Sequence, residues 1–122
     1  MNILVVDDDP VVLDSCKRIL EAEGHRVCLV ASADAALEAM GKTSFSLLII
    51  DVKMPVRDGV YLMAEVKTSW PDAAMIAMSG YTTPETIAAG EKMGAALFVA
   101  KPFTPDELMQ AVCRVMNRGA AP

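Results

Sequence analysis

The sequence predicts an α/β protein in which helices cover a parallel sheet. Short apolar runs alternate five times with segments of helical periodicity, which is the pattern of successive strand–helix units. Three of the apolar runs end in charge, at Asp7-Asp8, at Asp51 and at Lys101. Because a parallel sheet gathers the carboxyl ends of its strands along one edge, we expect these side chains to meet in one cleft.

The composition is that of one compact domain. Hydrophobic residues make up 53% of the 122 residues and charged residues 22%, so the chain can bury a real core. The formal net charge of -5 argues against a surface for nucleic acid, which requires clustered Lys and Arg. We therefore expect no direct nucleic-acid contact. No signal peptide or membrane-length apolar run appears, so we expect a cytoplasmic protein without membrane contact.

The three cysteines are widely spaced. Cys16, Cys28 and Cys113 show no C-x-x-C pattern, and His25 is the only histidine. This pattern predicts neither a disulfide nor a zinc site. We expect the three thiols to behave as small buried hydrophobic side chains.

The first strand is predicted at about residues 2–7. Asp9 is placed as the N-cap of the following helix, with Pro10 in the first turn, where a missing N–H removes no helical hydrogen bond. Gly24 suits the C-terminal cap of this helix, because helices often end at a left-handed glycine.

The middle of the chain repeats the strand–helix pattern twice. A second strand is predicted at about residues 26–31, and Ser32 is placed to cap the helix after it. The third strand is predicted at residues 47–50. Its helix should begin near Asp58 and stop at Trp70-Pro71, because the residue before a proline disfavours helical backbone.

The last two units differ in their helix signals. The fourth strand is predicted at residues 75–78, and Thr83-Pro84-Glu85 then opens a helix with good cap chemistry. Gly90 inside that helix costs ~1 kcal/mol relative to alanine, so we expect this helix to be the least secure. After a last strand at about residues 96–99, Thr104-Pro105-Asp106-Glu107 has the pattern of a capping box.

The charged strand ends suit a divalent cation and a phosphoryl group. Mg²⁺ prefers hard oxygen ligands, so Asp8 and Asp51 could bind it directly, with Asp7 acting directly or through water. A carboxylate can also accept a phosphoryl group, and Asp51 is the best candidate because its strand is central in the predicted order. Lys101 offers a point charge for a phosphate oxygen, and the Ser79 hydroxyl could reach another.

Each of these residues also has an ordinary interpretation. An acidic pair such as Asp7-Asp8 is usually only solvated, a lysine after a strand usually lies on the surface, and Ser79-Gly80 is usually a turn. Pro102 argues against the ordinary interpretation of Lys101, because an X-Pro bond can be held cis and fix a tight turn. The coincidence at separate strand ends favours a functional site far more than any single residue does.

Together these residues point to a known family: the chain resembles the receiver domain of bacterial two-component response regulators over residues 1–118. The resemblance implies a flavodoxin-like, doubly wound five-stranded parallel sheet of order 2-1-3-4-5, in three α/β/α layers. Residues 119–122 would be a tail or the start of a linker. The matching pieces, in the family's order and spacing, are Val5-Val6-Asp7-Asp8, Asp51-x-x-Met54-Pro55-x-x-Asp58-Gly59, Ser79-Gly80 and Lys101-Pro102-Phe103.

The resemblance implies a phosphoacceptor signalling domain. Asp51 would take a phosphoryl group from a histidine kinase or a histidine phosphotransfer protein, using Mg²⁺ or Mn²⁺, and a conformational change would control an output. By matching position, Asp8 and Asp51 would be side-chain metal ligands. The backbone carbonyl of Lys53 would be another ligand, and Asp7 would act through water.

The resemblance also implies how the signal is read. Ser79 and Lys101 would bind the phosphoryl oxygens, and the Lys101-Pro102 bond would be cis. Phe98 matches the family's switch aromatic, which turns inward as Ser79 moves toward the phosphate; plain core packing is the alternative for Phe98. Such a domain is a signalling switch that catalyses only its own phosphorylation and dephosphorylation. The alternative function is a receiver-like interaction module that never takes phosphate.

Lys53 and Tyr81 match positions at which the family sets the lifetime of the phosphoryl group. A long cation and an aromatic ring there could shield the site from attacking water, so we predict slow self-dephosphorylation. Tyr81 could equally be an exposed loop aromatic.

The last helix carries two neighbouring apolar stripes where one would suffice for the core. The second stripe could face a partner, and this motivates a possible homodimer through the last two helices. The first stripe is Leu108, Val112 and Val115, and the second is Met109, Cys113 and Met116.

Overall fold

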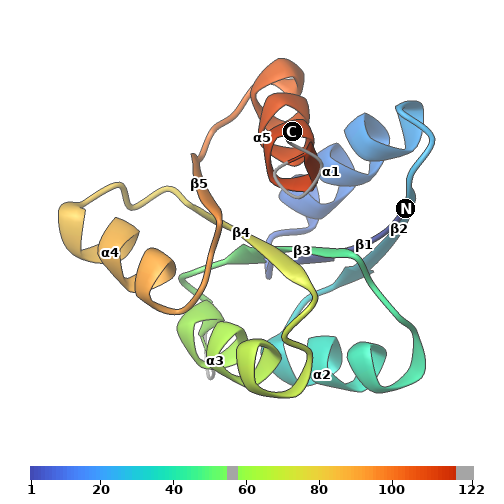
Figure 1. The fold of residues 1–122 in the computed structure, drawn as a ribbon. Coiled ribbons are helices and arrows are strands. Elements are labelled where there is room, and N and C mark those ends of the chain that lie inside the picture. Colours follow the sequence, from blue (N-terminus) through green and yellow to red (C-terminus); the bar gives the residue numbers. More distant parts are fainter. Residues whose placement is uncertain (55–57, 118–122) are drawn as a thin grey trace.

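The computed structural model describes residues 1–54 and 58–117, in which five strands alternate with five helices (Figure 1). Pro55 of the family motif and the tail at 119–122 lie outside the described residues. In chain order the elements are β1 (Asn2–Val6), α1 (Pro10–Ala22), β2 (Arg26–Val30), α2 (Ala33–Lys42), β3 (Leu47–Asp51), α3 (Gly59–Ser69), β4 (Ala74–Ser79), α4 (Pro84–Lys92), β5 (Leu97–Ala100) and α5 (Pro105–Asn117).

The strands form one parallel sheet in the order β2-β1-β3-β4-β5, which confirms the predicted fold class. Helices α1 and α5 lie on one face of the sheet, and α2, α3 and α4 lie on the other (Figure 1). β3 is the central strand, and Asp51 is its last residue.

Two hydrophobic cores lie between the sheet and the helices on its two faces. The strand 47–50 is fully buried, and its successive side chains point alternately to the two faces. Leu48 and Ile50 pack in the core beneath α2 and α3, whereas Leu47 and Ile49 pack in the core beneath α1 and α5. A strand buried on both sides reads as a continuous apolar run, which is why the sequence revealed it so clearly.

The predicted helix starts are confirmed. The side chains of Asp9, Ser32, Asp58 and Thr83 each accept a hydrogen bond from a backbone N–H in the first turn of the helix that follows. The capping box of α5 also forms: Glu107 Oε1 accepts from the Thr104 N–H at 2.9 Å, and Thr104 Oγ1 accepts from the Glu107 N–H at 3.1 Å. Gly24 has φ 87°, the left-handed backbone expected after α1.

Strand boundaries differ from the predictions by about one residue. The expectation of three buried cysteines was wrong for two of them: Cys16 is buried, but Cys28 on the edge strand β2 and Cys113 on α5 are exposed. In the second stripe of α5, Met109 and Met116 pack partly against the core. Ordinary packing therefore explains much of that stripe.

Candidate functional site

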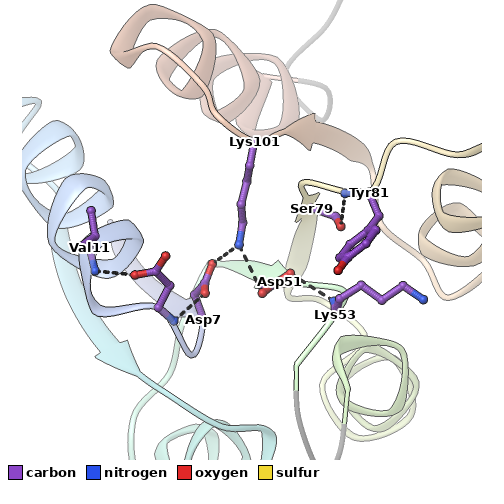
Figure 2. Close-up of polar contacts among 8 residues, drawn as sticks. Asp7, Val11, Asp51, Lys53, Ser79, Tyr81 and Lys101 are labelled. Carbon is purple, nitrogen blue, oxygen red and sulfur yellow. Dashed lines mark hydrogen bonds and ion pairs between the residues drawn. The ribbon is translucent and has the colours of Figure 1, made fainter.

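Four strand ends bring the predicted site residues to one edge of the sheet (Figure 2). Asp7 follows β1, Asp51 ends β3, Ser79 ends β4 and Lys101 follows β5. The register fixes their relative depth: the Lys101 N–H donates to the Ser79 carbonyl at 2.9 Å, and the Asp7 N–H donates to the Val30 carbonyl at 3.2 Å. The predicted meeting of these strand ends at one edge of the sheet is thus confirmed.

The Lys101 ammonium lies between two buried carboxylates. Its Nζ is 2.5 Å from Asp7 Oδ2 and 3.2 Å from Asp51 Oδ2. Asp7 is fully buried and Asp51 is 4% exposed, so water screens these charges poorly. One ammonium shared by two carboxylates leaves the cluster with net negative charge.

Backbone N–H groups hold the other oxygen of each carboxylate. Asp7 Oδ1 accepts from the Asp9 N–H at 2.9 Å, and Asp51 Oδ1 accepts from the Lys53 N–H at 3.1 Å (Figure 2). Both carboxylates are therefore oriented before any ligand binds. The sequence predicts Asp9 only as a helix cap and does not reveal this role of its backbone. Almost every residue type has a backbone N–H, so residue type does not indicate which group that N–H contacts.

The acidic cluster fits a hard divalent cation. Carboxylate oxygens of Asp7, Asp8 and Asp51 lie within 4.8 Å of one another, and Asp8 is exposed to solvent. Oxygen ligands, excess negative charge and access to water are the features that Mg²⁺ sites share. The predicted contribution of the Lys53 carbonyl stays a prediction.

Burial and charge shift the pKa values in this cluster. Burial, followed by the negative charge of Asp7, raises the pKa of Asp51 above its ordinary value of 3.8, although Lys101 and the Lys53 N–H act in the opposite direction. Burial alone would lower the pKa of Lys101, but its hydrogen bond to Asp7 and the charges of Asp51 and Asp7 outweigh burial and raise it. Lys101 therefore stays charged, whereas ionisation of Asp51 in the folded protein costs free energy.

Cys16 of α1 lies beneath the same cluster. Burial and the charge of Asp7 raise the pKa of this thiol to about 12, with Lys101 acting in the opposite direction. A residue that is both buried and protonated packs as a small apolar side chain. The prediction of a small buried hydrophobic side chain is therefore confirmed at this one cysteine.

The second side of the cleft carries Ser79, Tyr81 and Lys53. Ser79 is fully buried, and its Oγ accepts a hydrogen bond from the Tyr81 N–H at 2.9 Å. Tyr81 is 62% exposed, and Lys53 is exposed as well. Figure 2 shows the Tyr81 ring and the Lys53 side chain on the side of Asp51 away from Asp7.

Phe98 lies outside this cluster, on β5. It is half-buried and packs against the core beneath α2 and α3. The Lys101-Pro102 peptide bond is cis, as predicted.

A parallel α/β domain with an acidic pocket and a lysine at the carboxyl edge of its sheet is the class that this geometry defines. The family model described as the response regulator receiver domain matches residues 3–113. The chain therefore belongs to the response regulator receiver domain family. Receiver domains are signalling switches that accept a phosphoryl group in two-component signalling, bind Mg²⁺ at an acidic pocket and interact with histidine kinases or phosphotransfer proteins.

Curated relatives support the same assignment. The chain is 38% identical over 112 residues to the hydrogenase transcriptional regulatory protein HoxA of Cupriavidus necator, covering 91% of this chain and 23% of that protein. It is 34% identical over 107 residues to the transcriptional regulatory protein FixJ of Bradyrhizobium diazoefficiens, covering 88% of this chain and 52% of that protein. The chain thus spans between about a quarter and about half the length of these relatives.

Solved structures agree with the fold. A CheY-like response regulator receiver domain from Methanospirillum hungatei superimposes with a TM-score of 0.92 at 31% identity, covering 98% of this chain and 95% of that one. The chemotaxis protein CheY4 of Vibrio cholerae superimposes with a TM-score of 0.89 at 28% identity, covering 93% of this chain and 97% of that one. Over residues 1–54 and 58–117, no helix is both long and apolar enough to cross a membrane.

Proposed function

We propose that Asp51 is the phosphoacceptor of this receiver domain. The observation that carries the proposal is the position of its carboxylate, which ends the central strand 3.2 Å from the Lys101 ammonium and within the acidic cluster. Asp7 also pairs with Lys101, but it is fully buried, and Asp8 forms no ion pair among the described residues; Asp51 ends the central strand next to Lys101 and retains slight exposure.

The same cluster would hold the metal ion. Asp8 and Asp51 are the proposed carboxylate ligands, with Asp7 acting through water and Lys53 through its backbone carbonyl. Mg²⁺ bound there, or Mn²⁺ in its place, would supply positive charge next to the incoming phosphoryl oxygens. The excess negative charge of the cluster supports this assignment.

The chemistry required of the protein is simple. An Asp51 oxygen bonds to phosphorus as the bond from phosphorus to the donor histidine nitrogen breaks, and the free imidazole leaves. Lys101 offsets the charge of the phosphoryl oxygens, and the Ser79 hydroxyl donates a hydrogen bond to one of them. The hydrogen bond between the Lys101 N–H and the Ser79 carbonyl holds the two backbones together, so only their side chains need to move.

The switch would follow from Ser79. Its Oγ now accepts the Tyr81 N–H, and a turn toward the phosphoryl group would break that hydrogen bond and release the loop that precedes α4. Phe98, half-buried on the neighbouring strand, would then turn inward.

The partners in this proposal are a histidine kinase or phosphotransfer protein in the cytoplasm. Residues 1–118 form the receiver domain, and a homodimer through α4 and α5 is a further prediction that light scattering can test.

Lys53 and Tyr81 would set the lifetime of the signal. Both side chains are exposed and lie on the side of Asp51 away from Asp7 (Figure 2), where they could cover the approach to Asp51. A hydrolytic water must approach the phosphorus in line with the bond to Asp51, so bulky groups that cover this approach slow its attack. We therefore propose slow self-dephosphorylation.

Incubation with acetyl phosphate and Mg²⁺, followed by intact-mass measurement, tests the proposed acceptor. The wild-type protein should gain one phosphoryl group, and Asp51→Asn should gain none. Asp72→Asn is the matched control, because Asp72 is an exposed aspartate in the loop before β4. No gain by the wild-type protein would favour a receiver-like interaction module that does not take phosphate.

A further inference from the structure

Gly59, the first residue of α3, makes an unusually close contact with the strand that carries the acceptor. A Cβ atom built on Gly59 would lie 2.2 Å from the Asp51 carbonyl oxygen and 2.8 Å from the Val52 Cα. Both neighbours are backbone atoms, and Gly59 itself is buried. Any side chain at this position must therefore push the start of α3 away from the end of β3.

Hydrogen bonds hold this contact from both sides. The Gly59 N–H donates to the Val52 carbonyl at 3.0 Å, and the Val52 N–H donates to the Met78 carbonyl of β4 at 2.9 Å. The backbone of Asp51 and Val52 is thus clamped between β4 and the first turn of α3. The next residue, Lys53, donates the N–H that orients Asp51 Oδ1.

The other described glycines do not make a contact of this kind. A Cβ on Gly41 or Gly80 would meet nothing within 4 Å. A Cβ on Gly90 or Gly94 would meet side-chain atoms no closer than 3.2 Å. The clash with backbone is therefore particular to Gly59 among the described glycines, and it falls on the residue proposed as phosphoacceptor.

We propose that Gly59 is a positioning residue for the phosphoryl-transfer site, an inference that rests on the proposed function of Asp51. Its missing side chain lets α3 hold the peptide units from Asp51 to Lys53. That contact sets the Asp51 carboxylate relative to Lys101 and to the acidic cluster. Because real Cβ atoms essentially never come within 3.0 Å of such atoms, alanine at this position would displace the backbone by at least about 0.8 Å.

The central test compares Gly59→Ala with Gly41→Ala, a helical glycine with open space around it. Mg²⁺ affinity is measured by titration calorimetry, and phosphorylation by acetyl phosphate is measured at saturating Mg²⁺ in samples whose circular dichroism is native. We expect Gly59→Ala to weaken Mg²⁺ binding and to slow phosphorylation by about 10- to 100-fold, the scale for a misplacement near 1 Å. Gly41→Ala should match the wild-type protein in both.

A purely structural role for Gly59 would lower the unfolding midpoint but leave Mg²⁺ affinity and the rate per folded molecule unchanged, and that result would overturn the proposal. Failure of the proposed function looks different, because the wild-type protein itself would then take no phosphoryl group. In that case the comparison of Mg²⁺ affinity between the variants still tests the positioning role.

If Gly59→Ala does not fold, amide hydrogen exchange on the wild-type protein decides the question. Mg²⁺ binding must strengthen the contact that shapes its site, so exchange of the Gly59 N–H should slow on adding Mg²⁺. The comparison amide is the Ala36 N–H, which donates to the Ser32 carbonyl at 3.1 Å in the first turn of α2. Greater slowing at Gly59 than at Ala36 supports the proposal, and equal slowing contradicts it.

Discussion

The ammonium of Lys101 lies 2.5 Å from Asp7 Oδ2, and this ion pair joins two strand ends that are 94 residues apart in the chain. Asp7 is fully buried, so its carboxylate would be an uncompensated buried charge without Lys101. The same ammonium lies 3.2 Å from Asp51 Oδ2, so Lys101 is the cation that joins the carboxylates of Asp7 and Asp51.

Replacing Lys101 by methionine should destabilise the protein, because it leaves two buried carboxylates without their cation. We expect a loss in the free energy of unfolding on the order of 2 kcal/mol, the scale for a buried charged group that loses its partner. Lys42→Met is the control, since its ion pair with Glu38 is exposed and such pairs contribute roughly 0–1 kcal/mol. Urea unfolding without Mg²⁺ measures both variants, and equal losses would contradict the account.

Asp51→Asn should stabilise the metal-free protein near neutral pH. Burial and the charge of Asp7 raise the pKa of Asp51 in the folded state above its ordinary value of 3.8. Between the unfolded and folded pKa values, the folded protein binds more protons than the unfolded chain, so stability falls as the pH rises through that window. Above this pH window Asp51 is ionised in both states, so the folded protein carries the whole free-energy cost of its buried charge. Asparagine removes that cost.

The pH dependence provides the check on this prediction. Chemical unfolding from pH 7 downward should show the advantage of Asp51→Asn over wild type shrinking as the pH falls through this window and vanishing below 3.8, where Asp51 becomes protonated in both states. Asp72→Asn, at an exposed position, should show no comparable trend. An advantage that stays constant with pH would show that ionisation of Asp51 is not its cause.

Lys53→Ala and Tyr81→Ala should each shorten the lifetime of the phosphoryl group, because both remove bulk that could cover the approach to Asp51. We expect self-dephosphorylation to accelerate by up to about tenfold, which corresponds to about 1.4 kcal/mol of activation free energy. The decay of the phosphorylated mass after removal of acetyl phosphate gives the rate. Tyr81→Phe, which keeps the ring, and Lys92→Ala on α4 should decay like wild type; a wild-type lifetime of only seconds would refute the shielding role.

The three thiols should react at very different rates. Cys28 and Cys113 are exposed, whereas Cys16 is buried with its pKa raised to about 12, so little thiolate is available there. A colorimetric thiol reagent should modify two cysteines rapidly in the native protein and the third only on unfolding. Cys16→Ala should abolish the slow phase, and three fast thiols would show that α1 does not cover Cys16.

Much of the site could be predicted because strand ends in a parallel sheet share one edge. Asp51 and Lys101 each follow an unmistakable apolar run, so their meeting required only the fold class. Helix starts were equally visible, since a cap such as Asp58 acts through its own side chain and its neighbours in sequence.

What escaped prediction depends on packing between distant backbones. The contact of Gly59 with Asp51 arises from how closely α3 approaches β3, and a glycine at a helix start gives no indication of what it touches. The Asp9 N–H that orients Asp7 is invisible for the same reason. The exposure of Cys28 follows from its place on an edge strand, whereas residue type alone suggested burial.

The most direct test of the central claim identifies the acceptor atom by chemistry. Borohydride reduces an aspartyl phosphate to homoserine, so the protein is treated with acetyl phosphate and Mg²⁺, reduced, digested and sequenced by tandem mass spectrometry. The account predicts homoserine at position 51 and at no other aspartate. Homoserine at Asp7 or Asp8, or its absence from every position in a folded, Mg²⁺-treated sample, would contradict it.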